Sequence, residues 1–123
     1  MAQRRRVLIV DDEAGVRALL ARWLRGWGYA VRDAGTAQEA LDIMTVEPAD
    51  IVLSDISMPE QDGLWLAEQL HARWPAVPII MSTAHDEPEI VWRSRAAGAA
   101  AYVIKPFDPV MVREAVDTAA RRL

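Results

Sequence analysis

The chain has 123 residues, of which 52% are hydrophobic and 26% charged, and its formal net charge is -4. This length predicts one domain, spanning residues 1–123, with a hydrophobic core of its own, and the acidic balance argues against nucleic-acid binding. The chain has no cysteine, which excludes disulfides and thiolate metal sites, and no apolar run is long enough to cross a membrane. We therefore expect a single cytoplasmic domain.

Short apolar runs alternate with longer segments of helical period in the first half of the chain. Strands are predicted at residues 7–10, 29–31 and 51–54. Between the first two, apolar residues recur at the spacing of one helical stripe: Val16, Leu19, Leu20, Trp23, Leu24 and Trp27. Before the third strand, Thr36 and Glu39 predict a capping box that opens a second helix. The inner face of that helix should carry Ala37, Ala40, Leu41 and Met44.

The second half of the chain continues the alternation with three helices and two strands. The strands are predicted at residues 79–82 and 100–104, and the helices begin at the Asp62-Gly63 turn, at Glu87 and at Pro109. The helix over residues 87–97 is the least regular, because its apolar residues 90–92 are consecutive and define no single stripe. Trp92 could lie in the core or at a contact with a partner, and we favour the core.

Five alternating strand and helix units with wholly apolar strands predict a doubly wound α/β fold, in which helices cover both faces of a parallel sheet. Ligands of such sheets bind beyond the carboxyl ends of the strands. Polar residues follow four of these ends: Asp11 and Asp12 after the first strand, Asp55 after the third, Thr83 after the fourth and Lys105 after the fifth. The sequence therefore predicts that these five residues share one crevice.

Three carboxylates and one ammonium favour phosphate chemistry at this crevice. Two carboxylates about 4 Å apart repel each other by roughly 4 kcal/mol at an effective dielectric constant near 20, so the site needs a cation. Mg²⁺ prefers such oxygen ligands, and Lys105, the only lysine among 14 cationic residues, can serve one phosphate as a point charge. A carboxylate can itself act as the nucleophile and form an acyl phosphate.

The motifs around these positions are Val10-Asp11-Asp12-Glu13, Asp55 followed by Met58-Pro59 and Asp62-Gly63, Thr83-Ala84, and Tyr102 with Lys105-Pro106-Phe107. Together they resemble the receiver domain of bacterial two-component response regulators, and the resemblance spans essentially the whole chain. It implies the chemotaxis-regulator fold, a doubly wound (βα)5 sheet of five parallel strands in the order 2-1-3-4-5.

The resemblance also implies a role for each site residue. Asp55 is expected to be the phosphoacceptor. Mg²⁺ is expected to bind Asp12, Asp55 and the backbone carbonyl of Ser57, with Asp11 holding it through water, and Mn²⁺ or Ca²⁺ should substitute for it. Ser57 and His85 are expected to tune the loss of the phosphoryl group by controlling the access of water.

Four further positions are expected to bind the phosphoryl group or to relay its presence. These positions are Thr83, Ala84, Tyr102 and Lys105, of which Lys105 would pair with the phosphoryl group and Thr83 would donate its hydroxyl to it. Thr83 and Tyr102 would then remodel the surface made by the fourth helix, the fifth strand and the fifth helix. The peptide bond between Lys105 and Pro106 is expected to be cis.

The expected partners follow from the same resemblance. A sensor histidine kinase or a phosphotransfer protein would donate the phosphoryl group, and an unknown effector domain or target protein would read the result. We expect no direct contact with nucleic acid or membrane, and a monomer or weak dimer.

Three other functions compete with this interpretation. A degenerate receiver could act as a docking module without phosphorylation, although every phosphorylation position is filled here. A Mg²⁺-dependent phosphatase with an aspartate nucleophile needs a second acid two residues later, where this chain has Ser57. A mononucleotide binder needs an uncharged phosphate loop after the first strand, where residues 11–13 are acidic. The pattern thus favours a stoichiometric phosphoryl acceptor over an enzyme.

Overall fold

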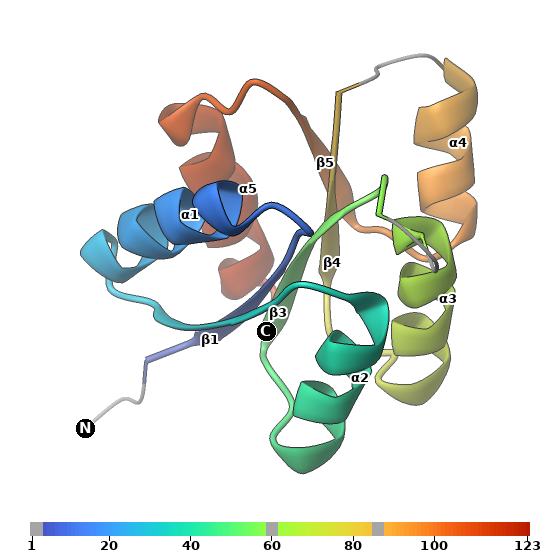
Figure 1. The fold of residues 1–123 in the computed structure, drawn as a ribbon, viewed down its shortest axis with the longest axis horizontal. Helices are drawn as coiled ribbons and strands as arrows, with labels where there is room; N and C mark the ends of the chain where they lie inside the picture. Colours follow the sequence, from blue (N-terminus) through green and yellow to red (C-terminus); the bar gives the residue numbers. More distant parts are fainter. Residues whose placement is uncertain (1–3, 59–61, 85–87) are drawn as a thin grey trace.

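The computed structural model describes residues 4–58, 62–84 and 88–123. Strands and helices alternate along these residues (Figure 1). In chain order they are β1 (Arg6–Val10), α1 (Ala14–Gly26), β2 (Ala30–Ala34), α2 (Ala37–Val46), β3 (Ile51–Asp55), α3 (Gly63–Arg73), β4 (Ile79–Thr83), α4 (Pro88–Ala96), β5 (Ala101–Ile104) and α5 (Pro109–Arg121). All strand pairs are parallel, in the order β2-β1-β3-β4-β5, so the predicted fold class and strand order are confirmed.

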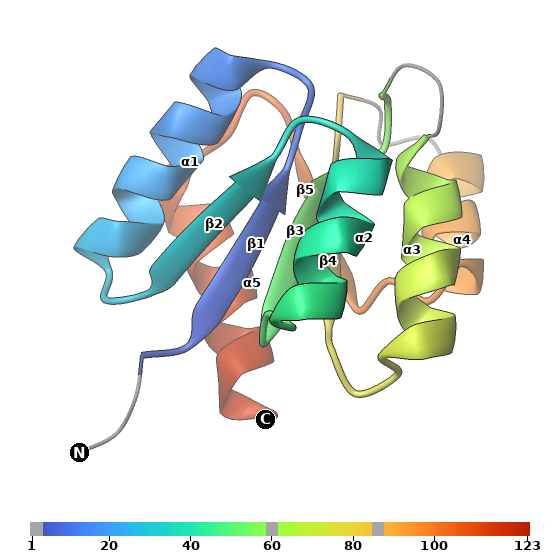
Figure 2. The same ribbon diagram turned by 60° about the horizontal axis from the view of Figure 1, so that its bottom comes forward.

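The sheet separates two layers of helices. Helices α1 and α5 lie on one face, and α2, α3 and α4 lie on the other (Figure 2). Successive side chains of a strand point to opposite faces. In β1, Val7 and Ile9 accordingly pack in the cluster that contains Leu24 of α1, while Leu8 and Val10 pack in the cluster on the other face. A strand that is buried on both faces must be apolar throughout, which explains the apolar runs of the sequence.

Among the described residues, side chains cap the starts of α2, α3 and α5. The Thr36 hydroxyl accepts a hydrogen bond from the Glu39 amide at 3.1 Å, as the predicted capping box requires. The Asp62 carboxylate accepts one from the Trp65 amide at 2.8 Å, and the Asp108 carboxylate one from the Val110 amide at 2.9 Å. These bonds satisfy amides that have no partner inside the helix. They set the first residues of α2, α3 and α5.

The predicted bounds of four strands agree with the structure to within one residue, but β2 differs. The apolar pattern predicts a strand over residues 29–31, whereas β2 runs from Ala30 to Ala34. The missed residues include Arg32 and Asp33, which are exposed because β2 is an edge strand. An edge strand tolerates charged residues, so the end of an apolar run does not mark its end.

Two predictions of buried residues are wrong. Leu19 is exposed on α1 and Ala21 is buried in its place, so the inner face of this helix is rotated from the predicted stripe. Trp92, placed in the core by the sequence pattern, is 70% exposed on α4. The buried residue of α4 is Ser94, whose hydroxyl donates to the Ile90 carbonyl at 2.8 Å and so carries no unsatisfied polar atom inward.

Among the helices that the structure describes, none combines the length and the apolar character needed to cross a bilayer. The predicted helix start at Glu87 lies outside the described residues, and α4 begins at Pro88.

Candidate functional site

The site lies at the carboxyl edge of the sheet, where β1 and β3 end side by side (Figure 1). Val10 pairs with Ser54 in the parallel register, so the next residues along, Asp11 and Asp55, are neighbours. This is the point at which the strand order reverses, because the chain passes from β1 to β2 on one side and to β3 on the other. Such points collect ligands in open α/β sheets.

Three carboxylates converge at this edge. Asp11, Asp12 and Asp55 each offer an oxygen atom, and these oxygens all lie within 4.8 Å of one another. Asp11 is 1% exposed and Asp55 is 5% exposed, whereas the side chain of Asp12 faces solvent. The structure therefore brings the predicted acids together and leaves one of them open to an approaching ion.

Lys105 joins two of the acids. Its Nζ atom donates to Asp11 Oδ2 and to Asp55 Oδ2, each at 3.2 Å. The Lys105 amide also donates to the Thr83 carbonyl at 2.7 Å, which extends the pairing of β5 with β4, and the following bond to Pro106 is cis. The lysine thus partly neutralises the two buried carboxylates of the site.

The surroundings change the protonation equilibria of this pair. Burial raises the pKa of Asp55, Lys105 opposes the rise, and the charge of Asp11 adds to it. Burial alone would lower the pKa of Lys105, but the carboxylates of Asp55 and Asp11 outweigh burial and raise it. Lys105 therefore stays charged, and it is the group that favours the ionised form of Asp55.

The loop after β3 contacts the Asp55 carboxylate through a backbone amide. The Ser57 amide donates to Asp55 Oδ1 at 3.2 Å, while the rest of Ser57 is exposed. Pro59 and His85, which the sequence analysis also assigns to this region, lie outside the described residues. The roles of Ser57 and His85 in the loss of phosphate stay predictions.

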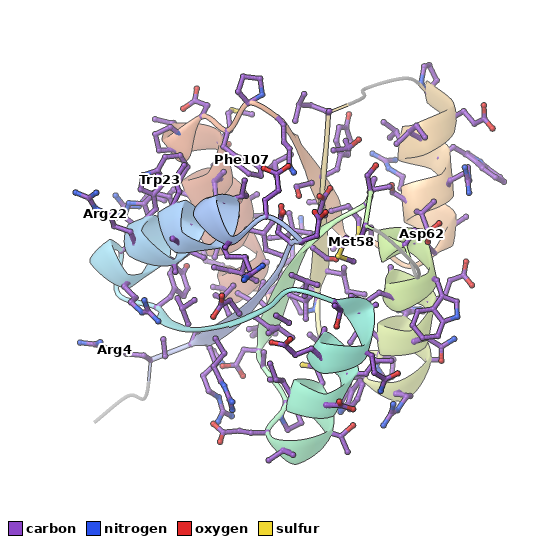
Figure 3. All side chains as sticks on the ribbon, viewed as in Figure 1. Arg4, Arg22, Trp23, Met58, Asp62 and Phe107 are labelled. Atoms are coloured by element: carbon purple, nitrogen blue, oxygen red, sulfur yellow. The ribbon has the colours of Figure 1, made fainter. Side chains whose placement is uncertain are left out.

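Gly63 allows the start of α3 to lie against the carbonyl group of Asp55. A Cβ atom on Gly63 would fall 2.0 Å from the Asp55 carbonyl oxygen, a distance that no side chain tolerates. The Gly63 amide donates to the Ile56 carbonyl at 2.8 Å, and Asp62, labelled in Figure 3, caps the helix. The Asp62-Gly63 pair therefore has the structural role predicted for it, and the close approach explains why the second residue is glycine.

Thr83 and Tyr102 lie on neighbouring strands beside the acids. Thr83 is buried at the end of β4, next to the end of β3, while Ala84 after it is exposed. Tyr102 is partly exposed on β5. Thr83 therefore lies next to the end of the strand that carries Asp55, and Tyr102 reaches the surface.

Phe107 and Met58 flank the site on its two sides (Figure 3). Phe107 packs against the core cluster that α1 and α5 cover, and Met58 belongs to the cluster on the α3 side. The Phe107 ring centroid is 5.8 Å from Lys105 Nζ. A change at the site therefore touches both layers of the fold.

Sequence reasoning missed Arg17 of α1. Its Nη1 atom donates to the carbonyl oxygen of Asp11 at 2.7 Å, and its Nε atom donates to Asp33 Oδ2 at 2.9 Å. An arginine next to Val16 on the inward side of a helix is an available signal, because a charged residue there needs a partner. The sequence does not reveal that the partner is a backbone carbonyl of the acidic loop.

The donor set fits a magnesium ion. Mg²⁺ takes oxygen ligands at about 2.0 Å in an octahedron, so adjacent ligand atoms lie about 2.9 Å apart and opposite ones about 4.1 Å apart. The three carboxylates offer oxygens within 4.8 Å of one another, and a single lysine contacts only two of them. The acids thus supply the charge that this ion needs, and a small movement would bring their oxygens to its spacing.

Three comparisons with known proteins agree with this geometry. The family model described as the response regulator receiver domain matches residues 7–117. The transcriptional regulatory protein PdtaR of Mycobacterium tuberculosis is 40% identical over 119 residues, which cover 96% of this chain and 58% of that protein. Sporulation initiation phosphotransferase F of Bacillus subtilis is 35% identical over 111 residues, which cover 90% of each chain.

Solved structures show the same architecture. Chemotaxis protein CheY4 of Vibrio cholerae superposes with a TM-score of 0.91 at 28% identity, covering 95% of this chain and 99% of that one. Some relatives are far longer, because the match spans only 21% of the DNA-binding transcriptional regulator NtrC of Klebsiella pneumoniae and just over half of PdtaR. With a family match over residues 7–117 and the acids and lysine in place, this chain belongs to the response regulator receiver domain family of two-component systems.

Proposed function

We propose that this chain is the phosphoacceptor switch of a two-component phosphorelay, with Asp55 as the residue that receives the phosphoryl group. The observation that carries the proposal is the position of Lys105 Nζ, 3.2 Å from both Asp55 Oδ2 and Asp11 Oδ2, within a cluster of three carboxylates. The Bacillus relative of nearly equal length is named as a phosphotransferase, which supports the same chemistry.

The donor in this proposal is the phosphohistidine of a sensor kinase or phosphotransfer protein. A carboxylate oxygen of Asp55 attacks phosphorus, the bond from phosphorus to the imidazole nitrogen breaks, and that nitrogen keeps the electron pair and takes up a proton. The product on this chain is an acyl phosphate. Lys105 favours the ionised Asp55 that the attack requires and can then pair with a phosphoryl oxygen, and Thr83 can donate its hydroxyl to another.

Asp12, Asp55 and the Ser57 carbonyl would hold Mg²⁺, with Asp11 acting through water. When bound, Mg²⁺ supplies charge neutralisation for the phosphoryl oxygens, which is the main requirement of phosphoryl transfer. Mn²⁺ and Ca²⁺ also prefer oxygen ligands and are expected to substitute.

The chain is proposed to be a stoichiometric acceptor and not an enzyme with turnover on phosphate esters. Turnover needs an acid that protonates the leaving group, and the residue two positions after Asp55 is Ser57. Loss of the phosphoryl group is then slow hydrolysis of the acyl phosphate, at a rate that Ser57 and His85 adjust.

The output is proposed to be a change of the surface formed by α4, β5 and α5. Thr83 lies at the end of β4 and pairs with Ile104 of β5, so a movement toward a phosphoryl group at Asp55 can reach the β5 surface on which Tyr102 is partly exposed. A linked effector domain or a separate target protein would read this surface. The chain itself would act in the cytoplasm, as a monomer or weak dimer, without contacting nucleic acid.

Labelling with acetyl phosphate and Mg²⁺ tests the proposal by intact mass. The parent protein should gain the mass of one phosphoryl group, and Asp55→Asn should gain none. Asp42→Asn, which changes an exposed carboxylate of α2, is the matched control and should label as the parent does. Full labelling of Asp55→Asn would contradict the acceptor assignment, and a parent that no donor labels would favour the docking module instead.

A further inference from the structure

Arg17 connects the acidic loop after β1 with the end of β2. The guanidinium group donates from Nη1 to the Asp11 carbonyl oxygen and from Nε to the Asp33 carboxylate. The Arg17 side chain is 21% exposed, and that of Asp33 is 50% exposed. An ion pair with one half-exposed partner adds little stability, so stability alone does not explain the arrangement.

The carbonyl that Arg17 binds belongs to the peptide unit between Asp11 and Asp12. A peptide unit is planar, so a hydrogen bond to its carbonyl oxygen also orients the amide and the Cα atom of Asp12. The rest of Asp11 has separate partners, because its amide donates to the Ala34 carbonyl at 3.1 Å and its Oδ1 accepts from the Glu13 amide at 2.9 Å. The Arg17 hydrogen bond thus holds the peptide unit that sets the direction of the Asp12 side chain.

The start of α1 offers no side-chain cap that could take over this task. Glu13 occupies the N-cap position without a capping hydrogen bond from its side chain. Among the described residues, the N-cap side chains of α2, α3 and α5 do accept such a hydrogen bond. The orientation of the acidic loop therefore depends on other contacts, among them the bond from the Arg17 side chain in the first turn of α1 and the bond from the Glu13 amide to Asp11 Oδ1.

Gly35, just after β2, leaves space for the guanidinium group. A Cβ atom at this position would lie 3.1 Å from Arg17 Nη1, which is closer than a side chain normally comes to another atom. Its backbone conformation does not itself demand glycine, because no positive φ occurs there. The local sequence thus accommodates Arg17 at this spot.

We propose that Arg17 is a positioning residue for the Mg²⁺ site: by holding the peptide between Asp11 and Asp12 against the end of β2, it aims the Asp12 carboxylate at the position of the ion before the ion arrives. This inference rests on the proposed function, since it assigns Asp12 to the metal. Arg17 is not a ligand and does not touch the phosphoryl group. It orients the Asp12 ligand before Mg²⁺ binds.

Simple electrostatics predicts the opposite effect of losing Arg17. Removing a positive charge close to three carboxylates makes the site more negative and should strengthen the binding of a cation. Losing the orientation of Asp12 should weaken it, and removal of a group that orients a metal ligand typically costs about tenfold or more in affinity. The sign of the change therefore separates the positioning role from a pure charge effect.

The test measures Mg²⁺ affinity by isothermal calorimetry on the full chain, well below the melting temperature. Arg17→Met should raise the dissociation constant about tenfold, and Arg17→Lys, which keeps the charge and can reach only one of the two acceptors, should raise it less. The matched control is Arg22→Met, because Arg22 points outward from the same helix (Figure 3). This control removes the same charge and should leave the affinity unchanged or slightly higher.

Asp33→Asn separates the effects of the two hydrogen bonds that Arg17 makes. It keeps an acceptor for Nε and leaves the bond to the Asp11 carbonyl, so its dissociation constant should stay within a factor of about three. In the metal-free protein, the amide resonance of Asp12 in a nitrogen-15 NMR spectrum should shift in Arg17→Met and stay in place in Arg22→Met.

The outcomes distinguish this inference from the proposed function. A parent protein that does not bind Mg²⁺ contradicts the metal site itself, whereas a parent that binds with unchanged or higher affinity in Arg17→Met contradicts only the positioning role. If Arg17→Met does not fold, Arg17→Gln replaces it, because glutamine is neutral and lacks the guanidinium group that holds the Asp11 carbonyl. Arg17→Gln should then weaken Mg²⁺ binding severalfold, and an unchanged affinity would overturn the inference.

Discussion

At the scale of single residues, opposing influences act on the pKa of Asp55. Burial and the neighbouring Asp11 charge raise its pKa, and Lys105 reduces the rise without reversing it. The folded protein therefore binds a proton at Asp55 more readily than the unfolded chain does. The ionised form that phosphoryl transfer requires thus carries a stability cost in the metal-free protein, which a cation or a neutral side chain would relieve.

Asp55→Asn should therefore be more stable than the parent protein at neutral pH in the presence of a chelator. Asparagine avoids the cost of burying a charge at this position, and the expected gain in the free energy of unfolding is on the order of 1 kcal/mol. Urea denaturation measures it. Asp42→Asn should stay within about 0.5 kcal/mol of the parent, as surface substitutions do. A less stable Asp55→Asn would mean that the pairing with Lys105 outweighs burial.

At the scale of elements, the junction of β3 and α3 positions the backbone of Asp55. Gly63 lets the first turn of α3 lie on the backbone of Asp55, and the Gly63 amide bonds the Ile56 carbonyl. The helix start and the strand end are therefore in contact through their backbones. This contact is a property of two elements together.

Gly63→Ala should be destabilised by about 1–3 kcal/mol, because the new methyl group would overlap the Asp55 carbonyl oxygen and force the helix or the strand to shift. Gly15→Ala is the matched control, since a Cβ there meets nothing within 4 Å in the first turn of α1. The control should gain about 0.5–1 kcal/mol from the better helix propensity of alanine. Thermal and urea unfolding measure both changes, and an undisturbed Gly63→Ala would contradict the close approach.

A second junction joins the turn before β2 to α5. The Tyr29 hydroxyl donates to Asp117 Oδ1, Arg113 pairs with Asp117, and the same arginine lies 5.7 Å from the centroid of the Trp27 ring. Burial is the main cause that raises the pKa of Tyr29 above its ordinary value of 10.0, and the hydrogen bond to Asp117 adds to it. The neutral phenol is thus the form that the fold prefers.

The stability of the parent protein should consequently fall more steeply above pH 10 than that of Tyr29→Phe. A folded pKa above the unfolded value gives stability that is complete below the unfolded pKa and is lost as the pH rises through the folded pKa. The raised pKa of Lys105 also lowers the stability of both proteins as the pH rises, so the difference between them isolates the effect of Tyr29. Urea denaturation at about pH 8 and about pH 10.5 compares them. Parallel losses would refute the assignment.

At the scale of the whole molecule, the site lies at the seam between two core clusters. Phe107 packs against one cluster and Met58 belongs to the other, and Lys105 joins the end of β5 to the acids after β1 and β3. In the proposed function, a phosphoryl group at Asp55 adds about 1.5 to 2 negative charges at pH 7 and is expected to attract Lys105 and the hydroxyl of Thr83. Both of these lie toward the β4 and β5 side of the sheet.

Hydrogen exchange with and without beryllofluoride, a phosphoryl mimic, should therefore change most in α4, β5 and α5. Exposed Trp92 and partly exposed Tyr102 lie on α4 and β5, so ordering of this region would alter an apolar surface available to a partner. The Asp55→Asn protein should not respond, because asparagine lacks the negatively charged carboxylate that would bind the mimic. Changes restricted to α1 and α2 would contradict the proposed output surface.

Much of this fold was predictable because its signals are local. Buried parallel strands require apolar runs, and helix starts at Thr36 and Pro109 require particular residues, so the alternation and its order follow from short segments. The convergence of Asp11, Asp55 and Lys105 was also predictable, since parallel strands bring their carboxyl ends to one edge of the sheet. The assignment of roles to these residues depended on the resemblance to a family.

Other features depend on contacts between distant segments, and the sequence alone did not show them. The length of β2 depends on its place at the edge of the sheet, and the exposure of Trp92 depends on how α4 lies against its neighbours. Arg17 and Gly63 contact the backbone carbonyls of site residues. Every residue has a backbone carbonyl, so no residue type in the sequence indicates such a contact. The sequence therefore determined which chemical groups meet at the sheet edge, because strand direction decides that. Tertiary structure decided which side chains orient those groups, because packing across segments decides which backbone atoms come within reach.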